Sequence, residues 1–386
     1  MVQSGALRAQ RMALALGGWV HPGAGGAAVV VESRVHLPLA LTRLAALPYP
    51  IDPSRPLVLL DTETTGLGTG VGTLPFLVGT GIWDGERLVV RQWYLPDQPQ
   101  EPGFLAAIAA TLPQDPWLVT YNGRSFDWPL LVARYRLQRR SAPAIEGNLD
   151  LLPVARQLWR HRLADARLAS VETGVAGVRR HGDLPGALIP ERYFRYLRTG
   201  EAAPLRDVGR HNLQDIVSLA MLLVVLAERL LPEDRRAACH PGDLAGLGAA
   251  YARRRRHEDA LRCYETALRT GLEPGLRRRT EVQRARALGR VGRHDEAAAA
   301  WQAMAESGGP GASAGWIQVA KHLEHVKVDL PAALAAAEQA RVRSERARLL
   351  GRPMYEVERD LAGRLPRLRR RLARCDAVAI ADAAIR

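Results

Sequence analysis

Two carboxylates, Asp61 and Glu63, follow a short apolar run that we predict to be a buried strand. The run, residues 57–60, is apolar at every position, as in strands that are covered on both faces. Side chains two positions apart on a strand point to the same face, so both carboxylates can converge on one point. Two neighbouring negative charges at the end of a buried strand are costly unless a cation lies between them. The pair therefore predicts a divalent metal site.

A third carboxylate, Asp127, follows another predicted strand. Asn122-Gly123 ends that strand, and Ser125 can cap the helix that comes next. Asp127 then lies in the first helical turn, near the edge of the sheet where ligands collect. Taken alone, Asp127 can equally be a residue that only complements the helix dipole.

A fourth carboxylate, Asp215, lies four residues after His211 on a long predicted helix. Residues four apart share one helical face, and Ile216 and Leu219 carry the apolar stripe beside it. This polar face can therefore border the core and point into a cleft. As an isolated pair, His and Asp at this spacing are more often a surface contact.

Together, the four carboxylates come from three separate segments and suit Mg²⁺ or Mn²⁺, which prefer oxygen ligands and bind substrate phosphate. Two such ions about 4 Å apart can activate a water and stabilise the leaving oxygen of a phosphodiester. A two-metal phosphodiesterase site is therefore the simplest explanation of these residues.

The predicted elements that must position the four carboxylates are, in order, three antiparallel strands, a helix, a parallel strand and a second helix. Asp84-Gly85 is a strong hairpin signal between the second and third of these strands. This order resembles that of ribonuclease-H-like α/β folds, with a mixed sheet flanked by helices. Strands are predicted at 27–32, 57–60, 74–83, 87–95 and 117–121, and helices at 40–46, 102–112, 125–137, 151–160, 190–198 and 207–231.

Three motifs resemble those of the DEDD (DnaQ-like) 3′–5′ exonucleases: Asp61-Thr-Glu-Thr-Thr-Gly66, Tyr121-Asn-Gly-Arg-Ser-Phe-Asp127 and the segment 211–215. More closely, the chain resembles the bacterial YprB family of ribonuclease-H-like proteins over about residues 50–340. Further features carry that likeness, namely Leu149-Asp150-Leu, Ala155-Arg-Gln-Leu-Trp159, Asp183-Leu-Pro-Gly186, His211-Asn212 and the helical tail.

The resemblance implies metal ligands at Asp61, Glu63, Asp127 and Asp215 and a general base or water-orienting group at His211. In the His-type exonucleases the His precedes the last Asp by five residues, and in the Tyr-type a Tyr precedes it by four. Here a His has the Tyr-type spacing, and one residue turns a helix by about 100°. Substrate contacts are predicted from the same motifs at Thr64, Asn122, Arg124 and Phe126.

Changes in composition predict three parts in this chain of 386 residues: an N-terminal extension (1–50) that packs on the main domain, the ribonuclease-H-like domain (51–231) and a helical domain (241–386). In the last part, Arg256-His-Glu-Asp-Ala260 recurs as Arg293-His-Asp-Glu-Ala297, a period of 37 residues. The repeat predicts a tetratricopeptide-like solenoid. A plain helical bundle is the alternative.

The net charge of +14 suits a polyanionic partner, here DNA or RNA. The same excess follows from a GC-rich genome, because nearly every basic residue is Arg and Lys occurs only at 321 and 327. The three cysteines are scattered and form neither a disulfide framework nor a CxxC metal pair. No apolar run is long enough for a membrane span, and 12–18 is too short for a signal sequence, so we expect a cytoplasmic protein.

These observations predict a metal-dependent nuclease, a 3′–5′ exonuclease that hydrolyses terminal phosphodiesters of DNA or RNA. The competing hypothesis is a weakly active or inactive nucleic-acid-binding scaffold whose helical repeats recruit a protein partner. The complete set of four carboxylates favours the nuclease, whereas the spacing of His211 permits the scaffold.

Overall fold

The computed structural model of the chain describes residues 2–66, 72–180, 182–309 and 311–385. It divides into two compact units, Met1–Leu247 and Gly248–Arg386. Within the described residues, no helix is both long enough and apolar enough to cross a membrane.

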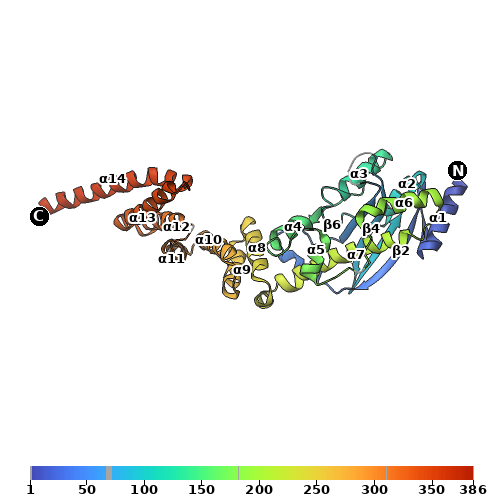
Figure 1. Cartoon of the computed structure of the whole chain (residues 1–386), viewed down its shortest axis with the longest axis horizontal. Coiled ribbons are helices and arrows are strands. Elements are labelled where there is room, and N and C mark those ends of the chain that lie inside the picture. Colours follow the sequence, from blue (N-terminus) through green and yellow to red (C-terminus); the bar gives the residue numbers. More distant parts are fainter. Residues whose placement is uncertain (1, 67–71, 181, 310, 386) are drawn as a thin grey trace. The chain divides into compact units, whose positions relative to one another are not determined.

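The first unit is built on a seven-stranded sheet with helices packed on it (Figure 1). The strand order is β1-β2-β5-β4-β3-β6-β7. The neighbours from β1 to β3 are antiparallel, whereas β3, β6 and β7 are parallel, so the predicted mixed sheet is confirmed. The strands are β1 (Trp19–Gly23), β2 (Gly26–His36), β3 (Leu57–Thr64), β4 (Pro75–Asp84), β5 (Arg87–Tyr94), β6 (Trp117–Thr120) and β7 (Gly147–Asp150).

The antiparallel strands β4 and β5 form the hairpin predicted from Asp84-Gly85. Asp84 pairs with Arg87, which leaves a two-residue loop, and Gly85 has the positive φ of 59° that such a tight turn requires. The first 50 residues contribute more than the single predicted strand, because both β1 and β2 extend the sheet beyond β5. The strand β7 was not predicted, since Gly147–Asp150 carries only one apolar residue.

The helices predicted in this unit are present with small shifts at their ends. One cap prediction is wrong: Phe126, not Ser125, precedes the first residue of α3, and no side chain caps that end. The helices are α1 (Val2–Leu16), α2 (Glu101–Thr111), α3 (Asp127–Leu137), α4 (Leu151–Leu158), α5 (Leu168–Val171), α6 (Ile189–Thr199) and α7 (Leu205–Val225), with short turns η1 (Leu41–Ala46), η2 (Gln98–Gln100), η3 (Glu172–Ala176), η4 (Gly186–Leu188), η5 (Leu226–Leu230) and η6 (Glu233–Ala238).

The alternation of side chains along β3 separates a core face from a polar face. Val58 and Leu60 pack in an apolar cluster with Phe104 and Ile108 of α2. Leu59 points the other way, towards α7, where a Cβ on Gly81 of the neighbouring strand would lie 3.1 Å from it. The strand is therefore covered on both faces, as its continuous apolar run predicts.

The second unit is helical in the part that the structure describes, and α8 enters it from the first unit. Gly248 of α8 approaches Tyr264 of α9 so closely that a Cβ would lie 2.5 Å from its ring. Both copies of the repeated segment begin a helix, at the start of α9 and of α11, and the tetratricopeptide-like assignment stays a prediction. The helices are α8 (Pro241–Arg253), α9 (His257–Thr270), α10 (Pro274–Arg290), α11 (His294–Glu306), α12 (Ala312–His322), η7 (Leu323–Lys327), α13 (Leu330–Leu349) and α14 (Tyr355–Ile385).

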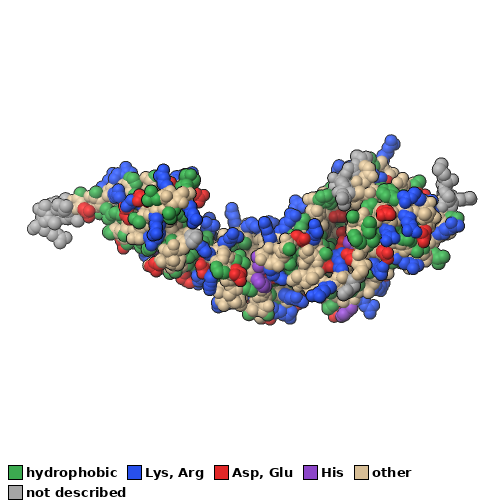
Figure 2. Space-filling view, viewed as in Figure 1, with side chains coloured by type: hydrophobic (Ala, Val, Ile, Leu, Met, Phe, Trp, Pro, Cys, Tyr) green, Lys and Arg blue, Asp and Glu red, His purple; other side chains and the backbone are tan. Residues whose placement is uncertain are grey.

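Basic side chains are spread over the visible face of both units, with acidic side chains among them (Figure 2). The second unit has three arginine-rich runs, 253–256, 277–279 and 368–371, and members of each form ion pairs within this unit. Arg256 pairs with Asp259, Arg277 with Glu281, and Arg369 with Glu338. These arginines are thus partly neutralised, which favours solvated helix faces over a basic track for nucleic acid.

A buried ion-pair cluster stabilises the second unit. The Glu324 carboxylate is completely buried and pairs with Arg364, Arg367 and Arg371. Burial disfavours its ionised form, but the hydrogen bond and charge of Arg367, followed by the charge of Arg364, outweigh that cost and hold the pKa of Glu324 below its usual value. The cluster therefore stabilises the fold at neutral pH.

Replacing Glu324 by Ala is expected to lower the free energy of unfolding of this unit by about 1.5–3 kcal/mol, because the buried Arg364 loses a charged hydrogen bond but keeps its pair with Asp360. Urea unfolding at neutral pH measures the change. Since the folded pKa is lowered, the stabilisation is present above the usual glutamate pKa and is lost as the pH falls through the lowered value. The control is Glu345→Ala, whose exposed pair with Arg341 is worth less than about 1 kcal/mol. An equal loss in both variants would contradict the prediction.

Candidate functional site

Asp61 and Glu63 lie near the end of β3, on the face that α7 covers. They pair across the sheet with Gly79 and Leu77 of β4. A Cβ on Gly79 would lie 2.3 Å from the Asn212 side-chain oxygen, so a glycine is needed for α7 to approach the strand here. Glu63 is only 8% exposed, and its Oε1 is buried and accepts no hydrogen bond within the described structure.

Asn212 of α7 fixes the orientation of Asp61. Its Nδ2 donates to Asp61 Oδ2 at 2.8 Å. Gln92 Nε2 donates to Asn212 Oδ1 at 3.0 Å and to the Gly209 carbonyl at 2.7 Å, which sets the orientation of the Asn212 amide. One oxygen of Asp61 is therefore held by a buried polar network on α7 and β5.

Asp127 lies in the first turn of α3, as predicted, and is its first residue; the Thr62 hydroxyl donates to its Oδ1 at 2.5 Å. The preceding loop keeps it close to β6, because a Cβ on Gly123 would lie 2.7 Å from Asp127 Oδ2. The negative charge of Asp127 acts on both Asp61 and Glu63. Because Asp127 also contacts β3, it does more than complement the helix dipole.

His211 faces the carboxylates from the first half of α7. Its Nε2 lies 3.6 Å from Asp215 Oδ2 and 4.0 Å from Glu63 Oε1. Its Nδ1 lies 2.7 Å from Asp183 Oδ1. These donor atoms of Glu63, His211 and Asp215 lie within 4.8 Å of one another, so the three residues could hold one metal ion.

Asp183 determines which ring nitrogen of His211 carries the proton. Burial opposes ionisation of Asp183, but the hydrogen bonds from His211 and Arg180 outweigh it and lower the pKa of this carboxyl. An ionised carboxylate only accepts hydrogen bonds, so the Nδ1–H of His211 donates to it. In the neutral imidazole this leaves the Nε2 lone pair facing Glu63 and Asp215.

Arg180 links the site to a buried glutamate. Its guanidinium donates from Nε to Glu172 Oε1 at 2.5 Å, from Nη1 to Asp183 Oδ2 at 2.9 Å, and from Nη2 to Asp215 Oδ1 at 2.5 Å. Glu172 is completely buried and also accepts a hydrogen bond from Ser218. Arg180 thus neutralises one oxygen of Asp215 and leaves the other, Oδ2, towards His211.

Crowding and burial raise the free-energy cost of ionising the four carboxylates of the site. Burial is the largest cause that raises the pKa of Asp61 and of Glu63 well above the usual range, followed by the charge of Asp215. Burial also raises the pKa of Asp127 to about 6, and raises that of Asp215 against the charges of His211 and Arg180. A divalent cation would remove this cost, and the unpartnered Glu63 Oε1 supplies a free ligand atom, so these residues fit the predicted metal.

The predicted substrate-contact residues have different surroundings. Arg124 is exposed, and Phe126 is exposed by 45%, an unusual position for a large apolar side chain. The Thr64 hydroxyl donates to the Gly66 carbonyl, and Asn122 has a positive φ of 65° with its backbone N–H bound to Asp150. Arg134, a second arginine close to Arg124 in the sequence, forms an ion pair with the buried Glu101.

Asp183, Arg180 and Asn212 were not predicted as site residues from the sequence. Asp183 and Asn212 belong to segments that carried the family resemblance, and that was their only signal. Arg180 gave no signal in the sequence, because an arginine beside Arg179 in an irregular segment looks like a solvated charge.

Replacing Arg180 by Ala is expected to lower the free energy of unfolding of the first unit by about 3–5 kcal/mol, because Glu172 is left as a buried, uncompensated charge. Thermal or urea unfolding followed by circular dichroism measures this loss. The neighbouring Arg179 is exposed, and Arg179→Ala should change stability by less than about 0.5 kcal/mol. If both variants unfold like the parent protein, the Glu172–Arg180 pair is not structural.

Comparisons with known proteins agree with the fold. Residues 58–227 match the family model described as the RNase H superfamily. The chain is 32% identical over 291 residues to "Uncharacterized protein YprB" of Bacillus subtilis (strain 168), an alignment that covers 74% of this chain and 68% of that protein.

Proposed function

Because this chain belongs to the YprB family of the RNase H superfamily, we propose that it is a metal-dependent nuclease, a 3′–5′ exonuclease acting on DNA or RNA. The observation that supports this most is the buried carboxylate cluster around His211, in which Glu63 Oε1 has no hydrogen-bond partner among the described residues. Asp61, Glu63, Asp127 and Asp215 would hold two Mg²⁺ or Mn²⁺ ions. When bound, these ions would activate a water and stabilise the leaving oxygen.

In this proposal, the protein's own side chains orient the nucleophile and take its proton. His211 Nε2 accepts a proton from the attacking water as the new oxygen–phosphorus bond forms. The bond from phosphorus to the 3′ oxygen of the preceding nucleotide breaks, and that oxygen takes a proton. The product is a nucleoside 5′-monophosphate. Asp183 acts through His211 as a positioning residue, and Arg180 holds Asp215 in one orientation.

Two of the four predicted substrate-contact residues, Phe126 and Arg124, are exposed just before Asp127 in the sequence. Phe126 offers an exposed aromatic face on which a terminal base can stack. Arg124 is an exposed cation two residues away and suits a backbone phosphate. Thr64 and Asn122 are engaged by local hydrogen bonds, so their contribution is to hold the loops that carry them.

A weakly active or inactive nucleic-acid-binding scaffold is the alternative, and one observation favours it. The bond from Arg180 to Asp215 Oδ1 places a fixed cation on one of the four carboxylates, where it competes with a metal ion. A protein partner for the helical repeats belongs to this alternative.

A cleavage assay distinguishes the two functions. The purified full chain is incubated with single- and double-stranded DNA and RNA, labelled at the 3′ or the 5′ end, with Mg²⁺, Mn²⁺ or EDTA. The nuclease predicts nucleoside 5′-monophosphates released from 3′ ends, only with metal. The Asp61→Asn/Glu63→Gln double variant, purified in parallel, reveals contaminating nuclease. Binding without metal-dependent cleavage of any substrate would support the scaffold and overturn the nuclease.

A further inference from the structure

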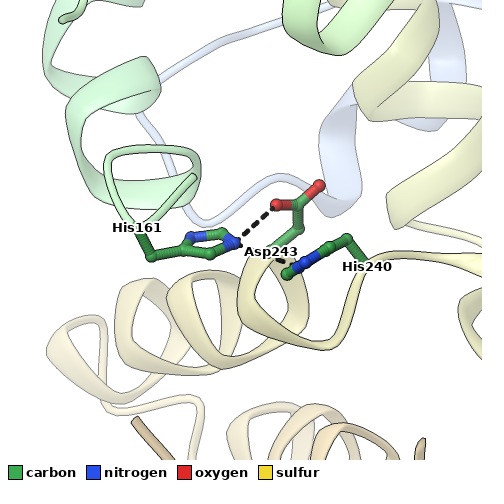
Figure 3. A group of neighbouring side chains, drawn as sticks. All are labelled: His161, His240 and Asp243. Carbon is green, nitrogen blue, oxygen red and sulfur yellow. Dashed lines mark hydrogen bonds and ion pairs between the residues drawn. The ribbon is translucent and has the colours of Figure 1, made fainter. Parts of the chain in front are cut away.

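A second group of metal-ligating side chains lies outside the carboxylate site. His161 follows α4, His240 precedes α8, and Asp243 is in the first turn of α8 (Figure 3). One donor atom from each of the three residues lies within 4.8 Å of the others. All three residues belong to the first unit.

The three side chains point towards one another (Figure 3). His161 Nε2 lies 3.0 Å from His240 Nδ1 and 3.4 Å from Asp243 Oδ1. His240 Nδ1 already accepts the Gly242 N–H at 3.1 Å, and a carboxylate oxygen can only accept. A single proton on His161 Nε2 can therefore form a good hydrogen bond to only one of the two acceptors, His240 Nδ1 or Asp243 Oδ1.

Two of the three separations between the ligand atoms fit a tetrahedral ion. Nitrogen and oxygen ligands at about 2.0–2.1 Å from Zn²⁺ are about 3.4 Å apart along the edges of a tetrahedron. The observed separations of 3.0 and 3.4 Å are close to that value. Imidazole nitrogen and carboxylate oxygen are common Zn²⁺ ligands, and three protein ligands leave a fourth position for water.

The neighbouring residues hold Asp243 in place and leave room for His161. Arg162 donates to both oxygens of Asp243, at 2.9 and 2.8 Å, so it orients this carboxylate, which is only 5% exposed, and an ion would share the carboxylate with this guanidinium. Gly242 clears the space for His161, because a Cβ there would lie 2.2 Å from His161 Nε2. His240 and Asp243 also line a pocket of about 600 Å³, which gives an ion a route of entry.

We propose that His161, His240 and Asp243 bind one Zn²⁺ ion, which ties the loop after α4 to the first turn of α8. The ion takes the His240 Nδ1 lone pair from the Gly242 N–H, and that N–H, in the first turn of a helix, can be solvated instead. The site is separate from the nuclease carboxylates, and its occupancy does not depend on the proposed nuclease activity.

Calorimetric titration of Zn²⁺ into the full, metal-stripped chain tests this site. The Asp61→Asn/Glu63→Gln variant serves as the parent protein in this titration, so that the carboxylate site around His211 does not compete for Zn²⁺. We expect one Zn²⁺ per chain, with the affinity lowered at least about 100-fold by His161→Ala or His240→Ala. His36→Ala is the matched control, since His36 is exposed on β2 and outside the cluster, and it should bind Zn²⁺ like the parent.

Two further measurements do not require the histidine variants to fold. Gly242→Ala keeps all three ligands but displaces the His161 ring, so it should also weaken Zn²⁺ binding. Co²⁺ added to the unchanged parent should give the visible absorption of a tetrahedral site. No saturable Zn²⁺ binding in the parent, no tetrahedral Co²⁺ band, or equal affinity in the parent and both histidine variants would overturn the proposal.

Discussion

Replacing Asp61 by Asn together with Glu63 by Gln is expected to lower metal-dependent cleavage by at least about 10³-fold. Bound metal ions contribute several kcal/mol to transition-state stabilisation, and each 1.4 kcal/mol corresponds to about a tenfold change in rate. Amides keep the shape of the carboxylates but lose their charge, and Glu63 Oε1 has no hydrogen-bond partner in the described part of the chain. Initial rates of 5′-monophosphate release at saturating Mn²⁺ measure the loss.

The same variant is expected to be more stable than the parent protein when both are free of metal. The folded-state pKa values of Asp61 and Glu63 are raised, chiefly by burial and then by Asp215, so their stabilising contribution is lost as the pH rises through those values. At neutral pH the amides avoid this cost. Adding Mn²⁺ should raise the melting temperature of the parent protein but not that of the variant.

The control for charge is Asp207→Asn, which removes one carboxylate from an exposed position on α7, where Asp207 pairs with Arg210. It should leave both the cleavage rate and the Mn²⁺-dependent stabilisation unchanged. If the Asp61/Glu63 variant retains the parent rate, the carboxylate cluster is not the nuclease site.

Replacing His211 by Ala is expected to lower kcat by about 10²–10⁴-fold with little change in KM, as for the loss of a general base. Its Nε2 faces Glu63 and Asp215 with a free lone pair, and Asp183 holds the opposite nitrogen. Single-turnover cleavage with saturating metal isolates the chemical step. A rate within about threefold of the parent would show that His211 is structural.

The affinity for Mn²⁺ separates the role of base from the role of ligand. His211 Nε2, Glu63 and Asp215 lie close enough to share an ion, so His211 is also a potential ligand. If His211 is the base, His211→Ala keeps the Mn²⁺ affinity of the parent. A loss of affinity together with the loss of rate would instead make His211 a ligand.

Asp183→Asn tests the positioning role. An amide can donate to Nδ1 of His211 and so move the proton to Nε2, which is the wrong tautomer for a base. We expect a loss of at least about tenfold in kcat, and the Asp183→Asn/His211→Ala double variant should be no slower than His211→Ala alone. Additive losses would show that the two residues act independently.

Much of the fold follows from local pattern. The apolar run before Asp61 predicts a strand covered on both faces, and Asp84-Gly85 predicts a hairpin, because both signals depend on neighbouring residues alone. The strand β7 escaped prediction because its place in the sheet comes from pairing with β6, a contact distant in sequence. Ser125 was a wrong cap, since α3 begins two residues later than predicted.

The sequence by itself determined which residues are proposed to carry the chemistry, namely two carboxylates two apart on a strand, one at a helix start, and a His and an Asp on one helical face. Their types and local spacings are properties of the chain alone. Only the tertiary structure decided that Asp183 and Arg180 join them, and that Nε2 of His211 is the nitrogen that faces Glu63. Those contacts cross long distances in sequence, and α7 reaches β3 and β4 only because Gly79 leaves room for Asn212, which no local pattern specifies.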